Sequence, residues 1–544
     1  MLVAEAVGRA LAGAGVDHVF GVVGSGNFHV TNAMVAAGAT FVATRHEGGA
    51  ATMADAYARM SRTVAAVSVH QGCGLTNAMT GVAEAAKSRT PLLVLAAAVS
   101  EPRSNFFVDQ DALARSVGAC PRRITSAPTA VDEALSALAL ALHQRRTVVL
   151  NLPLDVQATQ VPADPAAAEL PARPAPVEPG ETDLAALVET LDRSQRPVFV
   201  AGRGARDACR DDLEALARRH GALLATSAVA RGLFNGNGWS LDVSGGFSSP
   251  FVAATIADSD LVVGWGCSLN MWTMRHGRLV GAGTKVVQVD DDPAALGAHR
   301  AVDLGVVGDV ALTARRALER SGAERLGRRT PAMRADIAAR SRWRDVPYTD
   351  VSEAERIDPR TLSLALDDIL PDERVVSVDS GNFMGYPSMF LSVPDEDGFC
   401  LTQAFQSIGL GLATAVGAAL ARPERLPVAA LGDGGAMMAA AELDTVRRLG
   451  LPMVVIVYND DAYGAEVHHF GPDGHPTDLV RFPPTDIAAL ARGFGFQAVT
   501  VRAVEDLTAV REWVAGERSS PLLIDAKVVS SSGSWWLEEA FRGH

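Results

Sequence analysis

The sequence predicts an α/β protein built from three consecutive doubly wound domains, each with a parallel sheet. Three observations predict this class. Short runs such as VVIVY at 454–458 are apolar at every position, which is typical of strands buried on both faces. Stretches rich in good helix formers alternate with these runs along the chain. The chain has 544 residues, which is enough for about three domains of ordinary size.

The composition favours a soluble globular protein. Hydrophobic residues make up 48% of the chain and charged residues 21%, both ordinary values for this class. The formal net charge is −14. This negative balance disfavours nucleic acid and anionic membranes as main partners, because both attract basic surfaces.

Cysteine usage and the N-terminus predict a cytoplasmic protein. The five cysteines show no CxxC spacing, which argues against a disulfide framework or a structural zinc site. The first residues lack the basic start, continuous apolar core and cleavage site of a signal peptide. No window holds about 18 continuous apolar residues, so no membrane span is predicted.

The first predicted domain covers residues 1–162. Its strand candidates are the apolar runs at 19–23, 40–44, 64–69, 91–99 and 147–153. The following stretch, 163–183, is rich in proline and alanine with few large apolar residues, so we predict a linker there.

The second predicted domain covers residues 184–318. Its strand candidates lie at 197–201, 222–228, 260–266 and 284–290. Gly202-x-Gly204 begins a dinucleotide-binding fingerprint but lacks the third glycine and the acidic residue of the full pattern. The incomplete pattern therefore favours an ordinary strand-to-helix turn. Binding of FAD or another nucleotide at this turn stays an alternative that the sequence does not support. The charged, arginine-rich stretch 319–358 is predicted to connect to the next domain.

The third predicted domain covers residues 358–544, with strand candidates at 375–381, 428–435, 454–460 and 521–529. One of these strands ends in Gly432-Asp433-Gly434-Gly435, helix formers follow at 439–447, and the next strand ends in Asn459-Asp460. A right-handed crossover places the two strands side by side, so Asp433 and Asp460 should meet at the carboxyl edge of the sheet. Two carboxylates there can share a hard cation that bridges to phosphate.

These residues resemble the motif of thiamine diphosphate-dependent enzymes of the acetolactate synthase and benzoylformate decarboxylase type. The resemblance implies that Asp433, Asp460 and the Ala462 carbonyl hold Mg²⁺ against the cofactor diphosphate. It also implies cofactor contacts from Gly432, Gly434, Gly435, Tyr463 and Gly464. The last residue of the family motif is commonly Asn, and Asp460 in its place keeps an oxygen ligand.

A second half of the site is predicted in the first domain, where strand 40–44 leads through Arg45-His46-Glu47 into a small-residue helix. Taken alone, Glu47 is explained equally well as a helix N-terminal carboxylate and as a proton-transfer group. The resemblance implies that Glu47 is catalytic and binds N1′ of the cofactor's aminopyrimidine. His70 directly follows the predicted strand 64–69. A lone histidine is more often a structural partner, but in the benzoylformate decarboxylase-like branch a histidine here faces the substrate, so His70 is the second predicted catalytic residue.

The resemblance implies roles for several further residues. Ser380 and Asn382 are predicted to contact the diphosphate. The Gln406 carbonyl is predicted to accept a hydrogen bond from the cofactor's 4′-amino group, and Ile408 to lie under the thiazolium. Substrate contacts are predicted for Ser25, His29, Gln110, His468 and His469. The paired Trp535-Trp536 near the C-terminus is predicted to form a lid or a subunit contact.

The resemblance implies an enzyme that uses thiamine diphosphate and Mg²⁺ to decarboxylate a 2-oxo acid. The remaining fragment is then joined to an aldehyde or ketone acceptor, as in acetolactate synthase, or simply protonated, as in benzoylformate decarboxylase. A homodimer or homotetramer with active sites between subunits is expected. Two alternatives from other classes remain: a non-catalytic cofactor-binding homologue, and a flavin- or nicotinamide-dependent oxidoreductase that uses the second domain.

Overall fold

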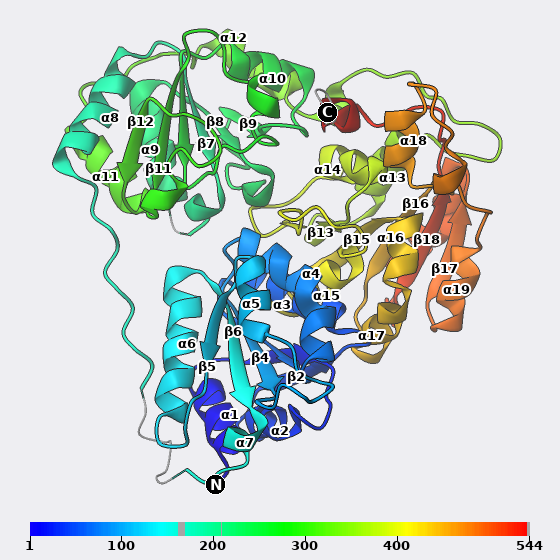
Figure 1. Ribbon diagram of the computed structural model, residues 1–544. Coiled ribbons are helices and arrows are strands. Elements are labelled where there is room, and N and C mark those ends of the chain that lie inside the picture. Colours follow the sequence, from blue (N-terminus) through cyan, green and yellow to red (C-terminus); the bar gives the residue numbers. More distant parts are fainter. Residues whose placement is uncertain (162–168, 208, 541–544) are drawn as a thin grey trace.

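The computed structural model describes residues 1–161, 169–207 and 209–540, and its chain forms three α/β lobes (Figure 1). Each lobe is built on a six-stranded sheet whose named strands all pair in parallel. This confirms the predicted fold class. The first predicted domain boundary, residue 162, and the start of the predicted linker, 163–168, lie outside the described residues.

The first sheet has the strand order β2-β1-β3-β4-β6-β5. Its strands are His18–Gly21 (β1), Thr40–Ala43 (β2), Ala65–Val69 (β3), Leu92–Ala98 (β4), Cys120–Arg123 (β5) and Thr147–Pro153 (β6). Its helices are Val3–Gly13 (α1), Phe28–Ala36 (α2), Glu47–Ser61 (α3), Cys73–Lys87 (α4), Gln110–Ser116 (α5), Ala130–Gln144 (α6) and Leu154–Gln157 (α7). The sequence pattern did not predict β5, because this half-exposed edge strand of sequence CPRR has no apolar run.

The third sheet repeats this order as β14-β13-β15-β16-β18-β17. Its strands are Arg374–Val378 (β13), Phe399–Leu401 (β14), Leu426–Gly432 (β15), Val454–Asn459 (β16), Gln497–Val501 (β17) and Leu522–Lys527 (β18). Its helices are Pro359–Ile369 (α13), Gly385–Phe390 (α14), Gly411–Ala421 (α15), Asp433–Met438 (α16), Leu443–Arg448 (α17), Gly464–Phe470 (α18), Ile487–Gly493 (α19), Thr508–Ala515 (α20) and Trp535–Ala540 (α21).

The central sheet has a different order, β12-β11-β10-β7-β8-β9. Its strands are Pro197–Ala201 (β7), Leu223–Thr226 (β8), Ser240–Val243 (β9), Leu261–Trp265 (β10), Lys285–Asp290 (β11) and Leu304–Val307 (β12). Its helices are Glu181–Arg193 (α8), Arg210–His220 (α9), Pro250–Ala257 (α10), Val310–Arg320 (α11) and Pro331–Arg340 (α12). Helix α12 belongs to the stretch predicted as a connection, but its Ile337 packs into the central core.

The incomplete glycine fingerprint forms a turn at the strand-order reversal of the central sheet. Gly202 N donates to Trp265 O and Gly204 N to Gly266 O, so the turn lies against the end of β10. A cavity of about 730 Å³ opens beside it, between the central domain, the first domain and the segment 173–177. Its lining is rich in arginine and includes Arg203.

The first and third domains pack against each other through helices. Helix α3 lies against α15, and Met53, Leu412 and Val416 share one buried apolar cluster (Figure 1). In both domains the strand order reverses between the first and third strands, β1/β3 and β13/β15. Ligands of open α/β sheets bind at such reversals, beyond the carboxyl ends of the strands. The fold thus offers one candidate binding edge in each of these two domains.

The structure also bears on the cysteines and on membrane-spanning helices. All five cysteines are free, so the structure contains no disulfide between them. Among the described helices, none has both the length and the apolar character that crossing a bilayer requires.

Candidate active site

Two carboxylates meet at the carboxyl edge of the third sheet. Strand β15 ends at Gly432 and α16 begins at once with Asp433, while the neighbouring β16 ends directly before Asp460. The two strands pair in parallel with Gly432 opposite Tyr458, so both aspartates emerge at the same edge. The two carboxyl groups lie close enough for each to affect the pKa of the other.

The helix after β15 begins earlier than the sequence pattern predicts. Instead of one helix over 439–447, α16 spans Asp433–Met438, a 3₁₀ turn follows at Ala440–Glu442, and α17 spans Leu443–Arg448. The carboxylate of Asp433 lies in the first turn, where it interacts favourably with the helix dipole. This offsets the poor helix propensity of the two glycines that follow.

The aspartate pair carries more negative charge than its surroundings neutralise. Burial and the charge of Asp460 raise the pKa of Asp433, and burial raises the pKa of Asp460 as well. Arg356 lies nearby, but its Nη2 is engaged 2.6 Å from Asp461 Oδ2. Two adjacent carboxylates of this kind, Asp433 buried and Asp460 half-buried, suit a divalent cation, which would relieve their repulsion.

The donor set suits Mg²⁺, a hard cation that prefers oxygen ligands. Within the described residues the Ala462 carbonyl makes no hydrogen bond, although the Asp461 carbonyl and the Tyr463 amide on either side do. A methyl group at Gly464 would overlap Asp460 Oδ2, so this glycine gives the carboxylate its space. No three His, Cys, Asp or Glu side chains cluster in the described part of the chain, so such a site would use two carboxylates and a backbone oxygen.

Asp379, which sequence reasoning missed, ties three parts of this edge together. It follows β13, is fully buried, and accepts hydrogen bonds from Ser380 N at 2.8 Å and Gly409 N at 3.0 Å. A methyl group at Gly435 would overlap its Oδ2. Burial raises the pKa of Asp379 to about 6, although the hydrogen bonds from these backbone donors lower it. Its place directly before Ser380 was the only signal in the sequence.

Asn382 is held by the C-terminal segment. Its Oδ1 accepts from Ser534 N at 2.8 Å, and its backbone carbonyl accepts from Ser534 Oγ at 2.7 Å and Trp536 Nε1 at 3.1 Å. A methyl group at Gly464 would also come within 3.3 Å of Asn382 Cβ. Asn382 therefore lies beside the aspartate pair, with its amide oxygen already bonded and its amide nitrogen left for a ligand.

The tryptophan pair near the C-terminus packs inside the chain rather than on its surface. The Trp536 ring lies 6.0 Å from that of Trp272 in the central domain, and the Trp535 ring lies 5.2 Å from that of Trp343. Trp536 is 8% exposed. The segment predicted as a lid or subunit contact thus fills the junction of two domains of its own chain.

The loop that carries Gln406 and Ile408 is fixed by the first domain. Glu84, fully buried on α4, accepts from Ala404 N at 3.0 Å and Phe405 N at 2.6 Å. Gln406 itself is exposed, with φ of 62°, and Ile408 is half-buried. The carboxylate of Glu84 therefore sets the start of this loop, and Asp379 sets its end at Gly409.

Glu47 and His70 face one turn of the first domain. Glu47 begins α3, and its Oε2 accepts from Asn77 Nδ2 of α4 at 3.1 Å. A methyl group at Gly74 would lie 3.2 Å from His70 Cβ and 3.5 Å from Glu47 Oε1. Gly26 N donates to His70 Nδ1 at 3.3 Å, so the ring proton is on Nε2, which remains a donor.

The helix that starts at Glu47 is capped by its neighbour and not by Glu47. His46 is the N-cap, and its Nδ1 accepts from Gly48 N at 3.0 Å. Glu442 of the third domain accepts from the backbone N–H of Arg45 and of His46, each at 3.0 Å. The segment before Glu47 is therefore positioned from the third domain, which leaves the Glu47 carboxylate free of a capping role.

The predicted substrate residues lie in three places. Ser25 and His29 are exposed at the loop and helix that follow β1, and Gly24 and Gly26 on either side of Ser25 lie against His70. Gln110 is buried. Its Oε1 accepts from Gly72 N and its Nε2 donates to Asn151, so both ends of its amide are bonded within the first domain. His468 and His469 lie in the last turn of α18, the helix that begins at Gly464, and burial lowers the pKa of His468.

Three family models match the chain in succession. They describe the N-terminal TPP binding domain (residues 1–117), the central domain (184–317) and the C-terminal TPP binding domain (379–526) of thiamine pyrophosphate enzymes.

Related proteins align with nearly the full length of this chain. An acetolactate synthase large subunit of Parasynechococcus marenigrum is 27% identical over 96% of this chain and 87% of its own. A protein of Pseudomonas aeruginosa named probable 2-ketoarginine decarboxylase is 30% identical over 92% of this chain and 89% of its own.

A solved structure shares the fold. A thiamine diphosphate-dependent 4-hydroxybenzoylformate decarboxylase of Rhodococcus jostii superposes with a TM-score of 0.81 at 22% identity, covering 98% of this chain and 100% of that one. With three domain models matched in order and a 30% identical relative along 92% of its length, the protein belongs to the thiamine pyrophosphate enzyme family, in its carboligase and decarboxylase class.

Proposed function

We propose that the protein binds thiamine diphosphate with Mg²⁺, removes CO₂ from a 2-oxo acid, and joins the remaining acyl fragment to a second carbonyl compound. The observation that carries the proposal is the Asp433–Asp460 pair at the carboxyl ends of β15 and β16, beside the strand-order reversal of the third sheet, whose like charges call for a cation. The acetolactate synthase relative that aligns with 96% of the chain supports ligation as the second step.

The third domain would hold the diphosphate end of the cofactor, and the first domain its pyrimidine. Asp433, Asp460 and the Ala462 carbonyl would bind Mg²⁺, with Ser380 and the Asn382 amide nitrogen beside them. When bound, the cofactor supplies a carbon nucleophile and an electron sink. The protein supplies position: Asp379 and Glu84 fix the two ends of the loop that presents the Gln406 carbonyl and Ile408.

Glu47 is the proton-transfer group of the first domain in this proposal. Because His46 caps the helix, the Glu47 carboxylate is committed only to Asn77 and can bond a nitrogen of the pyrimidine. Its half-buried position limits competition from water. Glu442 keeps the backbone before Glu47 in place, so the carboxylate keeps its direction.

A simple decarboxylase is the second candidate, and His70 is the observation that favours it. The hydrogen bond from Gly26 N fixes the proton on Nε2, so the ring can donate a proton to the acyl fragment in place of a second substrate. In the carboligase the same N–H would orient the acceptor carbonyl.

An assay with a panel of 2-oxo acids separates these functions. The protein would be incubated with thiamine diphosphate, Mg²⁺ and each acid, with and without an aldehyde or ketone acceptor, while CO₂ and products are measured. CO₂ with a ligated product identifies a carboligase, and CO₂ with an equal amount of aldehyde a decarboxylase. No CO₂ from any acid in a broad panel would refute both.

His70→Ala is expected to impair turnover while leaving the cofactor's reactive-carbon proton exchange unchanged, because His70 acts on substrate. General acid–base groups contribute about 10²–10⁴-fold, so a loss of kcat in that range is expected. Proton exchange measured by NMR in D₂O, beside steady-state kinetics, checks the separation. If exchange and turnover fall together, His70 serves the cofactor and not the substrate.

We also propose that the working enzyme is at least a homodimer. Within the described residues no hydrogen bond joins Glu47 to the aspartate pair. Large apolar side chains remain 42–56% exposed beside both halves of the site, which is typical of surfaces that become subunit contacts. They are Phe28, Phe106 and Phe107 in the first domain and Phe405, Met437 and Met438 in the third.

Light scattering is expected to give a particle of two or four copies of the 56.9 kDa chain. Because each site would combine the first domain of one subunit with the third domain of its partner, activity should disappear when the dimer dissociates. A monodisperse monomer with full activity at the assay concentration would contradict this arrangement.

A further inference from the structure

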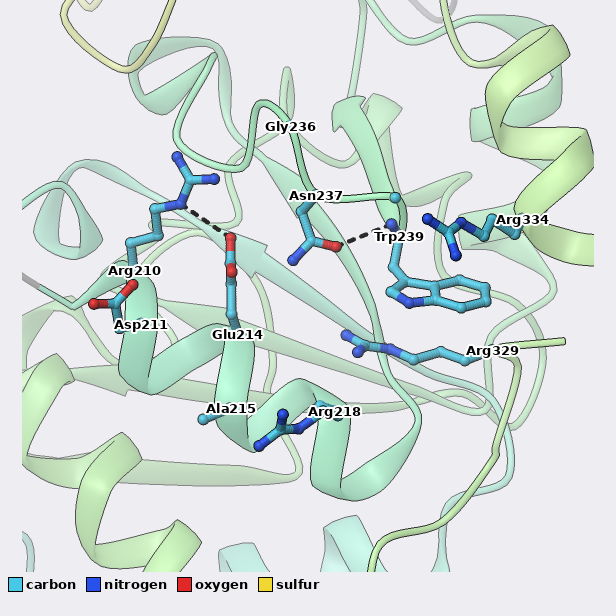
Figure 2. A pocket seen from close by; sticks show the side chains of 11 residues that line it. Arg210, Asp211, Glu214, Ala215, Arg218, Gly236, Asn237, Trp239, Arg329 and Arg334 are labelled. Carbon is cyan, nitrogen blue, oxygen red and sulfur yellow. Dashed lines mark hydrogen bonds and ion pairs between the residues drawn. The ribbon is translucent and has the colours of Figure 1, made fainter. Parts of the chain in front are cut away.

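A second hollow lies in the central domain, away from the candidate active site. It has a volume of about 490 Å³, within the range of small-molecule sites. One wall is a face of helix α9, and the other is the turn 236–239 before β9 together with the arginine-rich stretch around α12 (Figure 2). None of the residues that line this hollow belongs to the proposed cofactor site.

The α9 wall is close to electrically balanced. Arg210 Nε lies 3.0 Å from Glu214 Oε1, and Arg210 Nη2 donates to the Asn235 carbonyl at 2.6 Å. Arg218, further along the helix, has Glu324 at 3.7 Å. Each of these two arginines therefore has a carboxylate partner.

The opposite wall carries two guanidinium groups that form no ion pair with a carboxylate among the described residues, although Glu214 and Glu324 act on Arg329 from further away. Arg329 and Arg334 lie 5.6 and 6.0 Å from the ring centre of Trp239, and Figure 2 shows them on either side of the indole. Arg329 Nε donates to Ala222 O at 2.8 Å, but its Nη2 is sealed from solvent and unbonded. Burial lowers the pKa of Arg329 to about 10. An anion in the hollow cannot reach that sealed nitrogen, but a desolvated guanidinium charge without an ion-pair partner is costly, so an anion in the hollow would stabilise this wall.

Arg329 is anchored before any ligand arrives, whereas the exposed Arg334 lies over Trp239 and against the turn. A methyl group at Gly238 would lie 3.0 Å from Arg334 Nε, so the turn fits closely against this side chain. Asn237 Oδ1 accepts from Trp239 N at 3.0 Å, which fixes the side-chain amide and leaves its nitrogen as a third donor on the same wall. Donors ordered in advance lose little entropy when they bind.

We propose that this hollow is a binding site for a small anion with at least two oxygen acceptors, a phosphate or a dicarboxylate, held by Arg329, Arg334 and the Asn237 amide. A guanidinium group binds either anion through paired N–H donors. The indole is already flanked by two guanidinium groups, so the ligand meets their edges and does not stack on the ring.

Calorimetry with inorganic phosphate and, separately, malonate tests the site. The protein would first be saturated with thiamine diphosphate and Mg²⁺, and ionic strength kept low and constant, because salt screens such contacts. We expect at least one probe to bind saturably, and the tighter probe to identify the anion class. Arg334→Gln should weaken that binding about tenfold or more, the usual effect of losing a charged hydrogen bond.

Arg334 is the preferred position because its side chain makes no hydrogen bond or ion pair in the described structure, so its replacement should leave the fold intact. Arg329→Gln is a second variant with the same expected loss. Arg193→Gln is the matched control: this exposed arginine of α8 pairs with Glu189 in the same domain and should leave binding unchanged. No saturable binding of either probe, or equal binding by wild type and Arg334→Gln, would overturn the proposal.

Discussion

Replacing Glu47 with glutamine is expected to slow proton exchange at the reactive carbon of bound thiamine diphosphate by about 10²–10⁴-fold, the usual contribution of a general acid–base group. The amide keeps the size and hydrogen-bonding reach of the carboxyl but cannot pass a proton. NMR of the loaded protein in D₂O measures the exchange directly, without any assumption about the substrate. Calorimetry should show cofactor affinity little changed, because the diphosphate contacts lie in the third domain.

The structure supplies a matched control for this experiment. Glu442→Gln removes the charge that holds the Arg45 and His46 amides but leaves the Glu47 carboxylate in place. Exchange should then slow much less than in Glu47→Gln. If Glu47→Gln exchanges as fast as wild type, Glu47 belongs to the helix start alone and the proposed role is wrong.

Replacing Asp433 with alanine is expected to abolish Mg²⁺-dependent binding of thiamine diphosphate, with affinity lowered by at least about 100-fold. Residues that merely support metal ligands already cost about 10–100-fold when changed, and Asp433 is proposed as a direct ligand. Titration calorimetry of the cofactor with and without Mg²⁺ measures the effect. Asp473→Asn, which removes one exposed carboxylate of the loop after α18, should bind normally.

The fold should survive this change. In the metal-free protein Asp433 is buried against a second carboxylate, so its removal relieves a repulsion. The melting temperature of the metal-free variant should therefore equal or exceed that of wild type, while the rise in melting temperature on adding Mg²⁺ and cofactor should be lost. Unchanged cofactor affinity in Asp433→Ala would exclude the aspartate pair as the metal site.

Buried central strands were predictable because a strand buried on both faces needs an apolar side chain at nearly every position. The runs that became β4 and β16 are apolar throughout and were predicted from composition alone. The edge strands β5, β14 and β17 were missed because they are short or half-exposed, so pairing with a neighbour defines them more than their own residues do. The start of α16 was missed because a carboxylate overrides low helix propensity there.

Local motifs were sufficient to place Asp433, Asp460, Glu47 and His70 after strands. A buried strand ends where its apolar run gives way to glycine or polar residues, and this change can be seen in the neighbouring residues. The groups that orient these residues could not be found this way. The Glu442 carboxylate bonds a backbone amide 397 positions earlier in the chain, the Glu84 carboxylate one 321 positions later, and the Ser534 hydroxyl a backbone carbonyl 152 positions earlier. Such contacts depend on how the domains pack, which no local pattern encodes. The shared strand order of the first and third sheets, and the two arginines around Trp239 that form no ion pair, likewise emerge only when distant segments meet.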